Sequence, residues 1–196
     1  MTQALITFEE YLSLEAGDLP DGRFEYEDGE LKALPPESEP NNWIARCLLL
    51  LLANSNLVAA RLIVNHSCEV EVPVLQAGDP RTRIPDLVIL RPEHLALTQK
   101  RLTITREMPP PVLIAEVVSP GNANQQRDYE RKREQYEELG VLEYWLIDPQ
   151  QQAITVLALQ NGRYAEVGQF QENTQIVSLL FPDLSLTTQQ VLSAED

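Results

Sequence analysis

The sequence predicts an α/β fold with a mixed central sheet flanked by helices, built by residues 1–196 as a single domain. Short apolar segments bounded by proline, glycine and asparagine indicate buried strands, as at residues 112–118 and 144–147. Segments with a helical period alternate with them, at residues 41–53 and about 124–139. A chain of 196 residues is long enough to bury one substantial core.

The N-terminal part predicts a short helix and a hairpin. Thr7 and Glu10 match a capping box, and Gly17 ends the helix that follows. Asp28-Gly29 is typical of a two-residue turn between strands at residues 23–27 and 30–34.

The next part predicts a loop, a helix and two strands. Residues 35–40 contain several prolines and predict an exposed loop, and Asn41 or Asn42 is expected to cap the helix 41–53. Strands are expected at residues 57–64 and 68–74, on either side of a turn at 65–67. Glu69 and Glu71 alternate with apolar residues, which predicts that they lie on a solvated face.

The C-terminal half predicts the remaining elements. Residues 91–111 show no regular period and are expected to form a surface loop near the mouth of the site. Gly140 is expected to end the helix that precedes strand 144–147. Asn161-Gly162 indicates a second hairpin, between strands 153–159 and 164–167. A strand at 176–181 and a helix at 184–192 are expected to follow.

Bulk properties favour a soluble cytoplasmic protein. The N-terminus has no basic segment followed by an apolar core, and the longest apolar run, residues 47–53, is too short to span a bilayer. Cys47 and Cys68 fit neither a disulfide framework nor a zinc site, and we expect both to be small buried residues. Residues 48–52 are apolar on every side of their helix, and we therefore expect a homodimer.

The distribution of charge bears on nucleic-acid binding. The net charge is −15, which opposes binding to phosphates. Residues 81–133, however, carry ten basic and six acidic side chains, so that this segment is +4 and the remainder −19. We expect the positive charge to lie near the site, with a set of solvated surface arginines as the alternative.

Two acids in apolar strands suggest a metal site. Asp86 follows Pro85 at the start of one apolar strand, and Glu116 lies inside another. A buried carboxylate is costly unless it is paired or holds a cation, so a shared metal is one explanation. A strand-start cap for Asp86 and an ion pair with an arginine for Glu116 are the alternatives. Asp128, Lys132 and Tyr136 are spaced four residues apart and share one helix face.

Five short sequence motifs, in this order along the chain, resemble those of a known family. RFEYEDGEL, IPDLVIL, LIAEVVSP, the pattern D-x3-K-x3-Y and GVLEYWLIDP are similar to the Uma-two family of endonucleases. That family belongs to the restriction-endonuclease-like superfamily with the PD-(D/E)xK motif. The resemblance covers residues 7–192 and implies a restriction-endonuclease-like fold.

The resemblance implies hydrolysis of phosphodiester bonds in DNA with Mg²⁺ or Mn²⁺. Asp86 and Glu116 would be metal ligands, with the backbone carbonyl of Val117 as a third. Hard oxygen ligands suit these cations, and Mg²⁺ keeps several waters. Glu25 matches an acid that the superfamily often adds, with Glu30 as the alternative. Substrate binding is assigned to Arg83, Asp128 and Tyr136.

The chain departs from the motif at two positions. Val118 stands where the parent motif has a lysine, and Lys132 on the next helix is the expected replacement, although its basic neighbours are also typical of a solvated helix. Many family members carry a histidine where this chain has Asn41, which is no general base. His66 and His94 are expected to be surface residues, Trp145 a core residue and Asp148 a turn residue.

Three functions remain open from the sequence. The first is the metal-dependent endonuclease. The second is a catalytically decayed nucleic-acid-binding or protein-interaction domain on the same fold, favoured by the net charge and by Val118. The third, glycoside hydrolysis by paired acids, would need an aromatic-lined sugar cleft, which an aromatic content of 6% does not suggest.

Overall fold

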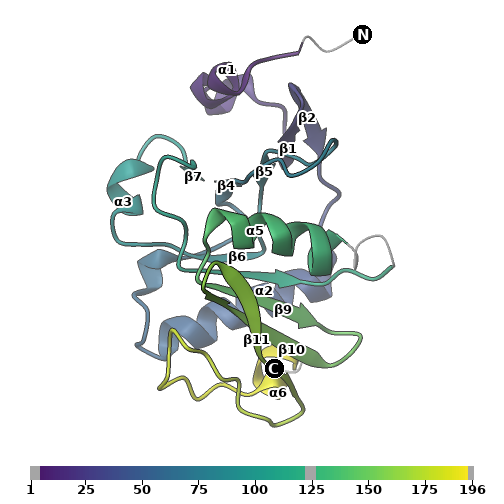
Figure 1. Cartoon of the computed structure of the whole chain (residues 1–196), viewed down its shortest axis with the longest axis vertical. Coiled ribbons are helices and arrows are strands. Elements are labelled where there is room, and N and C mark those ends of the chain that lie inside the picture. The colour runs from purple at the N-terminus through teal and green to yellow at the C-terminus, as the bar shows by residue number, and fades with distance from the viewer. Residues whose placement is uncertain (1–4, 122–126, 194–196) are drawn as a thin grey trace.

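A six-stranded mixed sheet forms the centre of the structure, a computed structural model that describes residues 5–121 and 127–193 (Figure 1). The strand order is β11-β10-β9-β8-β6-β3, and only β8 and β9 among these neighbours run parallel. These strands are β3 (Ile63–Asn65), β6 (Leu87–Ile89), β8 (Leu113–Val117), β9 (Glu143–Asp148), β10 (Ala153–Gln160) and β11 (Arg163–Gln171). The predicted fold class, a mixed central sheet flanked by helices, is confirmed.

Helices cover both faces of this sheet. Helices α2 (Glu39–Asn54) and α6 (Thr188–Leu192) pack on one face, where Leu48 and Val191 join Trp145 in one apolar cluster. The π-helical turn η3 (Arg127–Lys132) continues into α5 (Arg133–Leu139), which lies on the other face (Figure 1). There Tyr136 packs with Tyr144. Each face of the central strands is therefore buried against a different helical layer, and Trp145 is a core residue as predicted.

Helix α2 begins earlier than the sequence predicts. Ser38 is the N-cap, since its hydroxyl accepts from the backbone N–H of Asn41, and Pro40 lies in the first turn, where its missing N–H costs no hydrogen bond. The prediction of a cap at Asn41 or Asn42 is wrong, and Asn41 is a buried residue inside the helix. On the same helix Leu48 is buried whereas Leu50 is 48% exposed. The homodimer stays a prediction.

The N-terminal part packs as a small unit of its own (Figure 1). Helix α1 (Phe8–Ser13), the turn η1 (Ala16–Asp18) and the hairpin β1 (Phe24–Glu27) and β2 (Glu30–Ala33) form it, and the capping box of Thr7 and Glu10 is present. Asp28 and Gly29 have φ values of 47° and 88°, as the predicted tight turn requires. The guanidinium of Arg81 lies 3.8 Å from the centre of the Phe8 ring and ties the unit to the rest of the chain.

Glu69 and Glu71 lie inside the protein, and the predicted solvated face is wrong. They belong to β4 (Glu69–Glu71), the middle strand of a small sheet with β5 (Thr82–Arg83) and β7 (Thr103–Ile104). Glu69 accepts from the Thr103 hydroxyl at 2.7 Å and pairs with Arg101 at 3.1 Å. Glu71 pairs with Arg81 at 2.9 Å. An alternating strand pattern cannot distinguish a solvated acid from a buried acid with distant partners.

Three other segments differ from expectation. Residues 91–111 contain the short helix α3 (His94–Leu97) and strand β7, and none of them lines the cleft described below, so the loop predicted at its mouth is wrong. The first part of the strand expected at 57–64 is replaced by the turn η2 (Ala60–Leu62). No strand forms at 176–181, where the backbone is anchored by the buried Glu143. Glu143 accepts from the Leu179 and Leu180 N–H groups at 2.6 and 2.9 Å.

Two predicted chain reversals are confirmed, whereas two predicted helix bounds are wrong, because α1 ends at Ser13 and not at Gly17, and α6 begins at Thr188 and not at residue 184. The hairpin of β10 and β11 turns at Asn161-Gly162, and Gly140 ends α5 with φ of 90°. Cys68 is buried, while Cys47 is only half-buried. Within the described part of the chain, no helix combines the length and the apolar character that crossing a lipid bilayer requires.

Candidate functional site

Strand register places His66, Asp86 and Glu116 side by side. In the central sheet Leu87 of β6 pairs with Ala115 of β8 and with Asn65 of β3. Both pairs are antiparallel, so extending them by one residue sets Asp86 beside Glu116 and beside His66. The backbone N–H of His66 donates to the Asp86 carbonyl at 3.1 Å, which continues the ladder to this level.

The Asp86 carboxylate is buried and held from two sides. Its Oδ2 accepts from the Val117 N–H at 2.7 Å, and its Oδ1 lies 3.3 Å from Nδ1 of His66. Burial alone would raise the pKa of Asp86, but His66, the charge of Lys132 and the Val117 N–H together hold it below the usual value. Asp86 is therefore an ionised acid at neutral pH, as a metal ligand would have to be.

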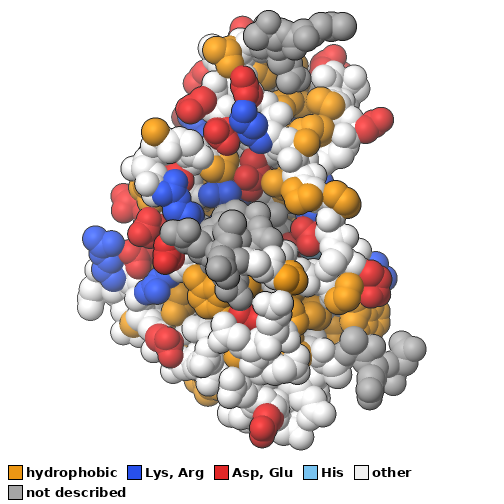
Figure 2. All heavy atoms as spheres, turned by 90° about the vertical axis from the view of Figure 1, so that its right-hand side faces the viewer, with side chains coloured by type: hydrophobic (Ala, Val, Ile, Leu, Met, Phe, Trp, Pro, Cys, Tyr) orange, Lys and Arg blue, Asp and Glu red, His pale blue; other side chains and the backbone are white. Residues whose placement is uncertain are grey.

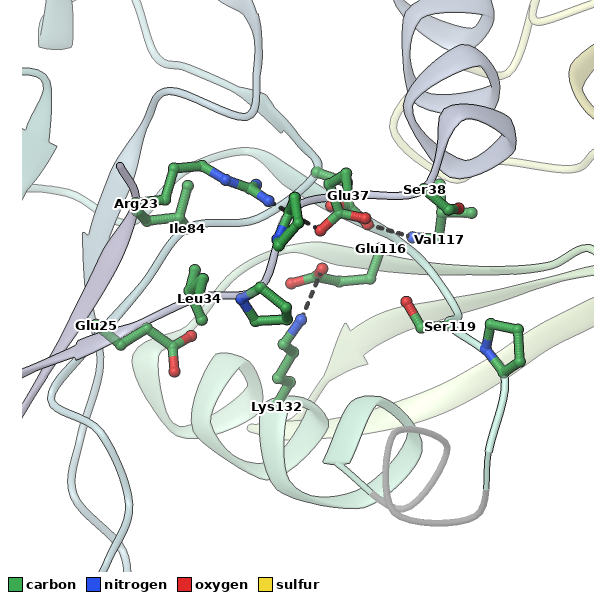
Figure 3. A pocket seen from close by; sticks show the side chains of 14 residues that line it. Arg23, Glu25, Leu34, Glu37, Ser38, Ile84, Glu116, Val117, Ser119 and Lys132 are labelled. Atoms are coloured by element: carbon green, nitrogen blue, oxygen red, sulfur yellow. Dashed lines mark hydrogen bonds and ion pairs between the residues drawn. The ribbon is translucent and has the colours of Figure 1, made fainter. Parts of the chain in front are cut away.

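The Glu116 carboxylate is bound by two side chains from the helical layer. Lys132 Nζ lies 2.8 Å from Oε2 (Figure 3). The Tyr136 hydroxyl donates to Oε1 at 2.8 Å. Only 2% of the Glu116 side chain is exposed. Burial and the charge of Glu116 raise the pKa of Tyr136 far above its usual value, so Tyr136 remains a hydrogen-bond donor.

The junction between η3 and α5 brings Lys132 to Glu116. Lys132 is the last residue of η3, and Tyr136 follows four positions later in α5, so both face the same strand. Tyr129 ties η3 to the end of β9 by donating to Asp148 at 3.0 Å. Asp148 also accepts from the Gln150 N–H at 2.9 Å, which confirms it as a turn residue. The predicted face included Asp128, whose side chain lies outside the described residues.

Val118, which stands where the motif has a lysine, is a core residue. Its side chain is 1% exposed and packs in the apolar cluster below α5. Glu116 and Val118 are two apart on the strand path and face the same side. The cation that pairs with Glu116 therefore comes from the helix that covers this side.

Glu25 lines the site and is held there by Arg83, which is itself fixed by Gln135. Its carboxylate pairs with Arg83 Nη1 at 3.1 Å, and Arg83 Nε donates to Gln135 Oε1 at 2.9 Å. Gln135 in turn donates to the carbonyl of Pro73 at 2.8 Å. Arg83 is 3% exposed and does not line the cleft, and its contact to substrate stays a prediction. Tyr136 is fully buried, and its predicted contact to substrate likewise stays a prediction.

A cleft of about 270 Å³ opens over these residues (Figure 3). Asp86, Glu116, Val117, Glu25 and Lys132 line it together with the segment Leu34 to Ser38 of the loop before α2. Arg23 and Glu37 form an ion pair of 3.0 Å in its wall. The structure therefore brings five of the predicted site residues to one opening, from β1, the start of β6, β8 and η3.

The positive charge of residues 81–133 does not gather at this cleft. Among the described lining residues two are basic, Arg23 and Lys132, against four acids, Glu25, Glu37, Asp86 and Glu116. Four arginines of the segment are instead paired with acids of other elements: Arg81 with Glu71, Arg83 with Glu25, Arg101 with Glu69 and Arg131 with Asp79. Figure 2 shows basic side chains interspersed among acidic ones on the face it presents, and no basic patch there. The cleft thus favours cations over phosphates.

Sequence reasoning missed two residues of the site region. His66 was expected at the surface, but it lies against Asp86, and a histidine in a turn carries no sequence pattern that would reveal this contact. Arg23 was assigned no role, and it lines the cleft. His94 is not a surface residue either, since it is fully buried with its ring between the Arg91 N–H and the Pro109 carbonyl.

The possible metal ligands at the site, the carboxylates of Asp86 and Glu116, fit a cation that needs few protein ligands. Among residues 5–121 and 127–193 no group of three or more histidine, cysteine, aspartate or glutamate side chains has a metal-binding arrangement. Asp86 and Glu116 form a pair of hard oxygen donors, and Mg²⁺ is often held by one or two carboxylates and several waters. Glu116 would bind the ion with an oxygen that now contacts Lys132 or Tyr136.

The fold and the paired acids of the cleft define a protein of the restriction-endonuclease-like class. The chain belongs to the Uma2 family, described as "Putative restriction endonuclease", whose model matches residues 8–189. It is also similar to a crystal structure titled as that of "a putative nuclease belonging to DUF820" from Anabaena variabilis, at 18% identity and a TM-score of 0.65, over 95% of this chain and 97% of that one. At this identity the likeness concerns the fold. No curated protein matches the sequence.

Proposed function

We propose that this protein is a metal-dependent DNA endonuclease that hydrolyses phosphodiester bonds. The observation that carries the proposal is the pair of buried acids, Asp86 and Glu116, on neighbouring strands beside Lys132 in one cleft. Membership of a family described as restriction endonucleases supports the choice of substrate.

In this proposal Asp86 and Glu116 hold Mg²⁺ or Mn²⁺, with the Val117 carbonyl as a third ligand. The bound cation would lower the pKa of a water and stabilise negative charge on the reacting phosphate. The Val117 N–H and His66 keep Asp86 ionised, and Tyr136 fixes the Glu116 carboxylate by its hydroxyl. Both acids are thus preorganised before substrate arrives.

Lys132 is proposed as the catalytic lysine. Its ammonium balances the charge of Glu116, and it lies at the cleft, where it can also approach a phosphate or a water. Glu25 is proposed to assist, either on the metal or through a water, from a position fixed by Arg83. A conformation in which Arg23 leaves Glu37 would offer the cleft a second cation for phosphate.

The alternative, a decayed nucleic-acid-binding or interaction domain, is less well supported. Such a domain would need a cationic surface for phosphates, and the cleft has more acids than bases. A divalent cation removes this difficulty because it offsets the charge of the two acids.

Mn²⁺ titration by calorimetry tests the site without knowledge of the sequence that is cut. We expect one saturable site in the wild type, and we expect Asp86→Asn and Glu116→Gln each to weaken it strongly. Glu37→Gln is the matched control, because it removes an acid from the same cleft but not a ligand. Equal binding by all four proteins would contradict the proposal.

Cleavage follows as the second stage of the test. Plasmid, linear and single-stranded DNA are incubated with Mg²⁺ and with the wild type, Lys132→Ala or Asp86→Asn. Metal binding with no cleavage of any substrate would favour the interaction domain.

A further inference from the structure

His66 lies in an unusual backbone conformation beside the site. It occupies the turn between β3 and β4 with φ of 52°, a left-handed value that is uncommon outside glycine and that asparagine, aspartate and histidine adopt more often than other residues. Its N–H donates to the Asp86 carbonyl at 3.1 Å, so the turn is fastened to the residue that carries the acid. The chain thereby directs a bulky ring toward Asp86 at some cost in backbone strain.

Neither ring nitrogen of His66 has a hydrogen-bond partner within the described residues. Nδ1 lies 3.3 Å from Asp86 Oδ1, which is ion-pair distance, but its alignment falls short of a hydrogen bond. Nε2 is also buried without a partner. Buried polar atoms are rarely left unpaired, and a small rotation of the ring would let Nδ1–H donate to Oδ1. The second oxygen of Asp86 is already held by the Val117 N–H.

We propose that His66 is a positioning residue for the metal site, acting through Asp86. Its Nδ1–H restrains Oδ1 while the Val117 N–H restrains Oδ2, so that the carboxylate keeps one orientation toward the cleft. Metal-binding carboxylates depend on such outer partners, and loss of a partner lowers metal affinity about 10- to 100-fold. The inference rests on the proposed metal site for its functional consequence, but the contact itself can be tested without metal.

His66 acts on the metal through Asp86 and not as a ligand. It does not line the cleft, and in the described chain it joins no group of three potential ligands. Its partner atom is an oxygen of Asp86. Substitutions of His66 should therefore distinguish the effect of its hydrogen bond to Asp86 from the effects of losing the ring and of relaxing the backbone.

Three variants make that separation. Asparagine at 66 places an amide N–H as many bonds from Cα as Nδ1, and it tolerates positive φ. Glycine releases the backbone and removes the donor, and alanine removes the donor but retains the strain. The wild type is expected to bind Mn²⁺ in calorimetry with an affinity that His66→Asn nearly preserves. His66→Gly is expected to bind about 10- to 100-fold more weakly although it melts no earlier than His66→Ala.

A double-mutant cycle supplies the metal-free measurement. The melting temperatures of the wild type, His66→Gly, Asp86→Ala and the double variant are compared in EDTA. A hydrogen bond between the two side chains makes the effect of His66→Gly smaller when Asp86 is already replaced. Additive shifts would overturn the inference.

The outcomes separate this inference from the proposed function. If the wild type binds Mn²⁺, two results would overturn the positioning role and leave the metal site intact. One is that His66→Gly binds Mn²⁺ as tightly as the wild type. The other is that His66→Gly and His66→Asn lose equal affinity. If the wild type does not bind Mn²⁺, the metal site is wrong and the metal role of His66 falls with it. The cycle then decides only whether His66 holds Asp86.

Discussion

Lys132 Nζ lies 2.8 Å from Glu116 Oε2, and the two side chains are only 9% and 2% exposed. The lysine comes from the end of η3 and the acid from β8. The helical turn therefore supplies the positive charge that the motif lysine would supply at the position of Val118. Burial makes an unpaired carboxylate costly, and the lysine offsets this cost in the metal-free protein.

Replacing Lys132 by methionine should destabilise the protein by about 3–5 kcal/mol, because Glu116 would remain buried without its cation. Urea denaturation in EDTA measures the loss. The double variant Lys132→Met with Glu116→Gln should recover much of it, since the buried charge is then absent. A single variant as stable as the wild type would show that Glu116 is solvated or protonated in the folded chain.

Replacing Glu143 by alanine should destabilise the protein by at least about 3 kcal/mol. The carboxylate accepts four hydrogen bonds, from the Trp145 indole, the Ser178 hydroxyl and the N–H groups of Leu179 and Leu180. Each buried donor left unpaired costs about 1–3 kcal/mol. At about 2–4 °C per kcal/mol, the melting temperature should fall by at least about 6 °C. Glu172→Ala, at an exposed site, is the control and should change it little.

The buried His94 should make the protein less stable in mild acid. Burial lowers the pKa of His94, and its Nδ1 accepts from the Arg91 N–H, which the protonated ring cannot do. In the window between the lowered folded pKa and the unfolded value of about 6.5, the unfolded chain binds more protons. The stabilising contribution is therefore fully present above about pH 6.5 and is lost as pH falls through the folded pKa.

Urea denaturation of the wild type and His94→Gln between about pH 5 and 7.5 measures this effect. The variant should be less stable at the upper end but should show a shallower decline with acid. Parallel pH profiles for the two proteins would assign the decline to other groups.

Removing Arg23 should weaken DNA binding in a salt-dependent manner. Arg23 is one of the two cations among the described cleft residues, and its partner Glu37 is partly exposed. If Arg23 contacts one phosphate, Arg23→Ala should reduce the slope of log affinity against log salt by about one. Fluorescence anisotropy with Ca²⁺ in place of Mg²⁺ gives the slope. Arg163→Ala is the control, since this exposed arginine pairs with Glu137 away from the cleft.

The sequence predicted the strands and helices that have strong local patterns. The strands β8 and β9, the hairpin at Asn161-Gly162 and the end of α5 at Gly140 follow from apolar runs and turn residues. The position of Asp86 beside Glu116 was also expected, because each is the acid of its own apolar segment. Their role as metal ligands stays a prediction.

Features that depend on distant partners could not be predicted. Glu69 and Glu71 have the same alternating pattern as solvated acids, and only the approach of Arg101 and Arg81 shows why they are buried. Arg83 likewise gives no sign in the sequence that Glu25 and Gln135 enclose it. The contact of His66 with Asp86 depends on a backbone angle that a single sequence does not specify.

Some residues of the site lie close together in the sequence, within the connection between β8 and β9, whereas others come from distant segments. Glu116, Lys132 and Tyr136 fall within 21 consecutive residues, whereas Asp86, Glu25 and His66 come from earlier segments 30 to 91 positions from Glu116. Contacts between residues close in sequence cost less loop-closure entropy than contacts between distant ones. The acid and its cation can therefore form one local folding unit, to which Asp86 is added only when β6 joins β8. If β6 separated from β8, Asp86 would leave the site, whereas Glu116 would remain paired with Lys132.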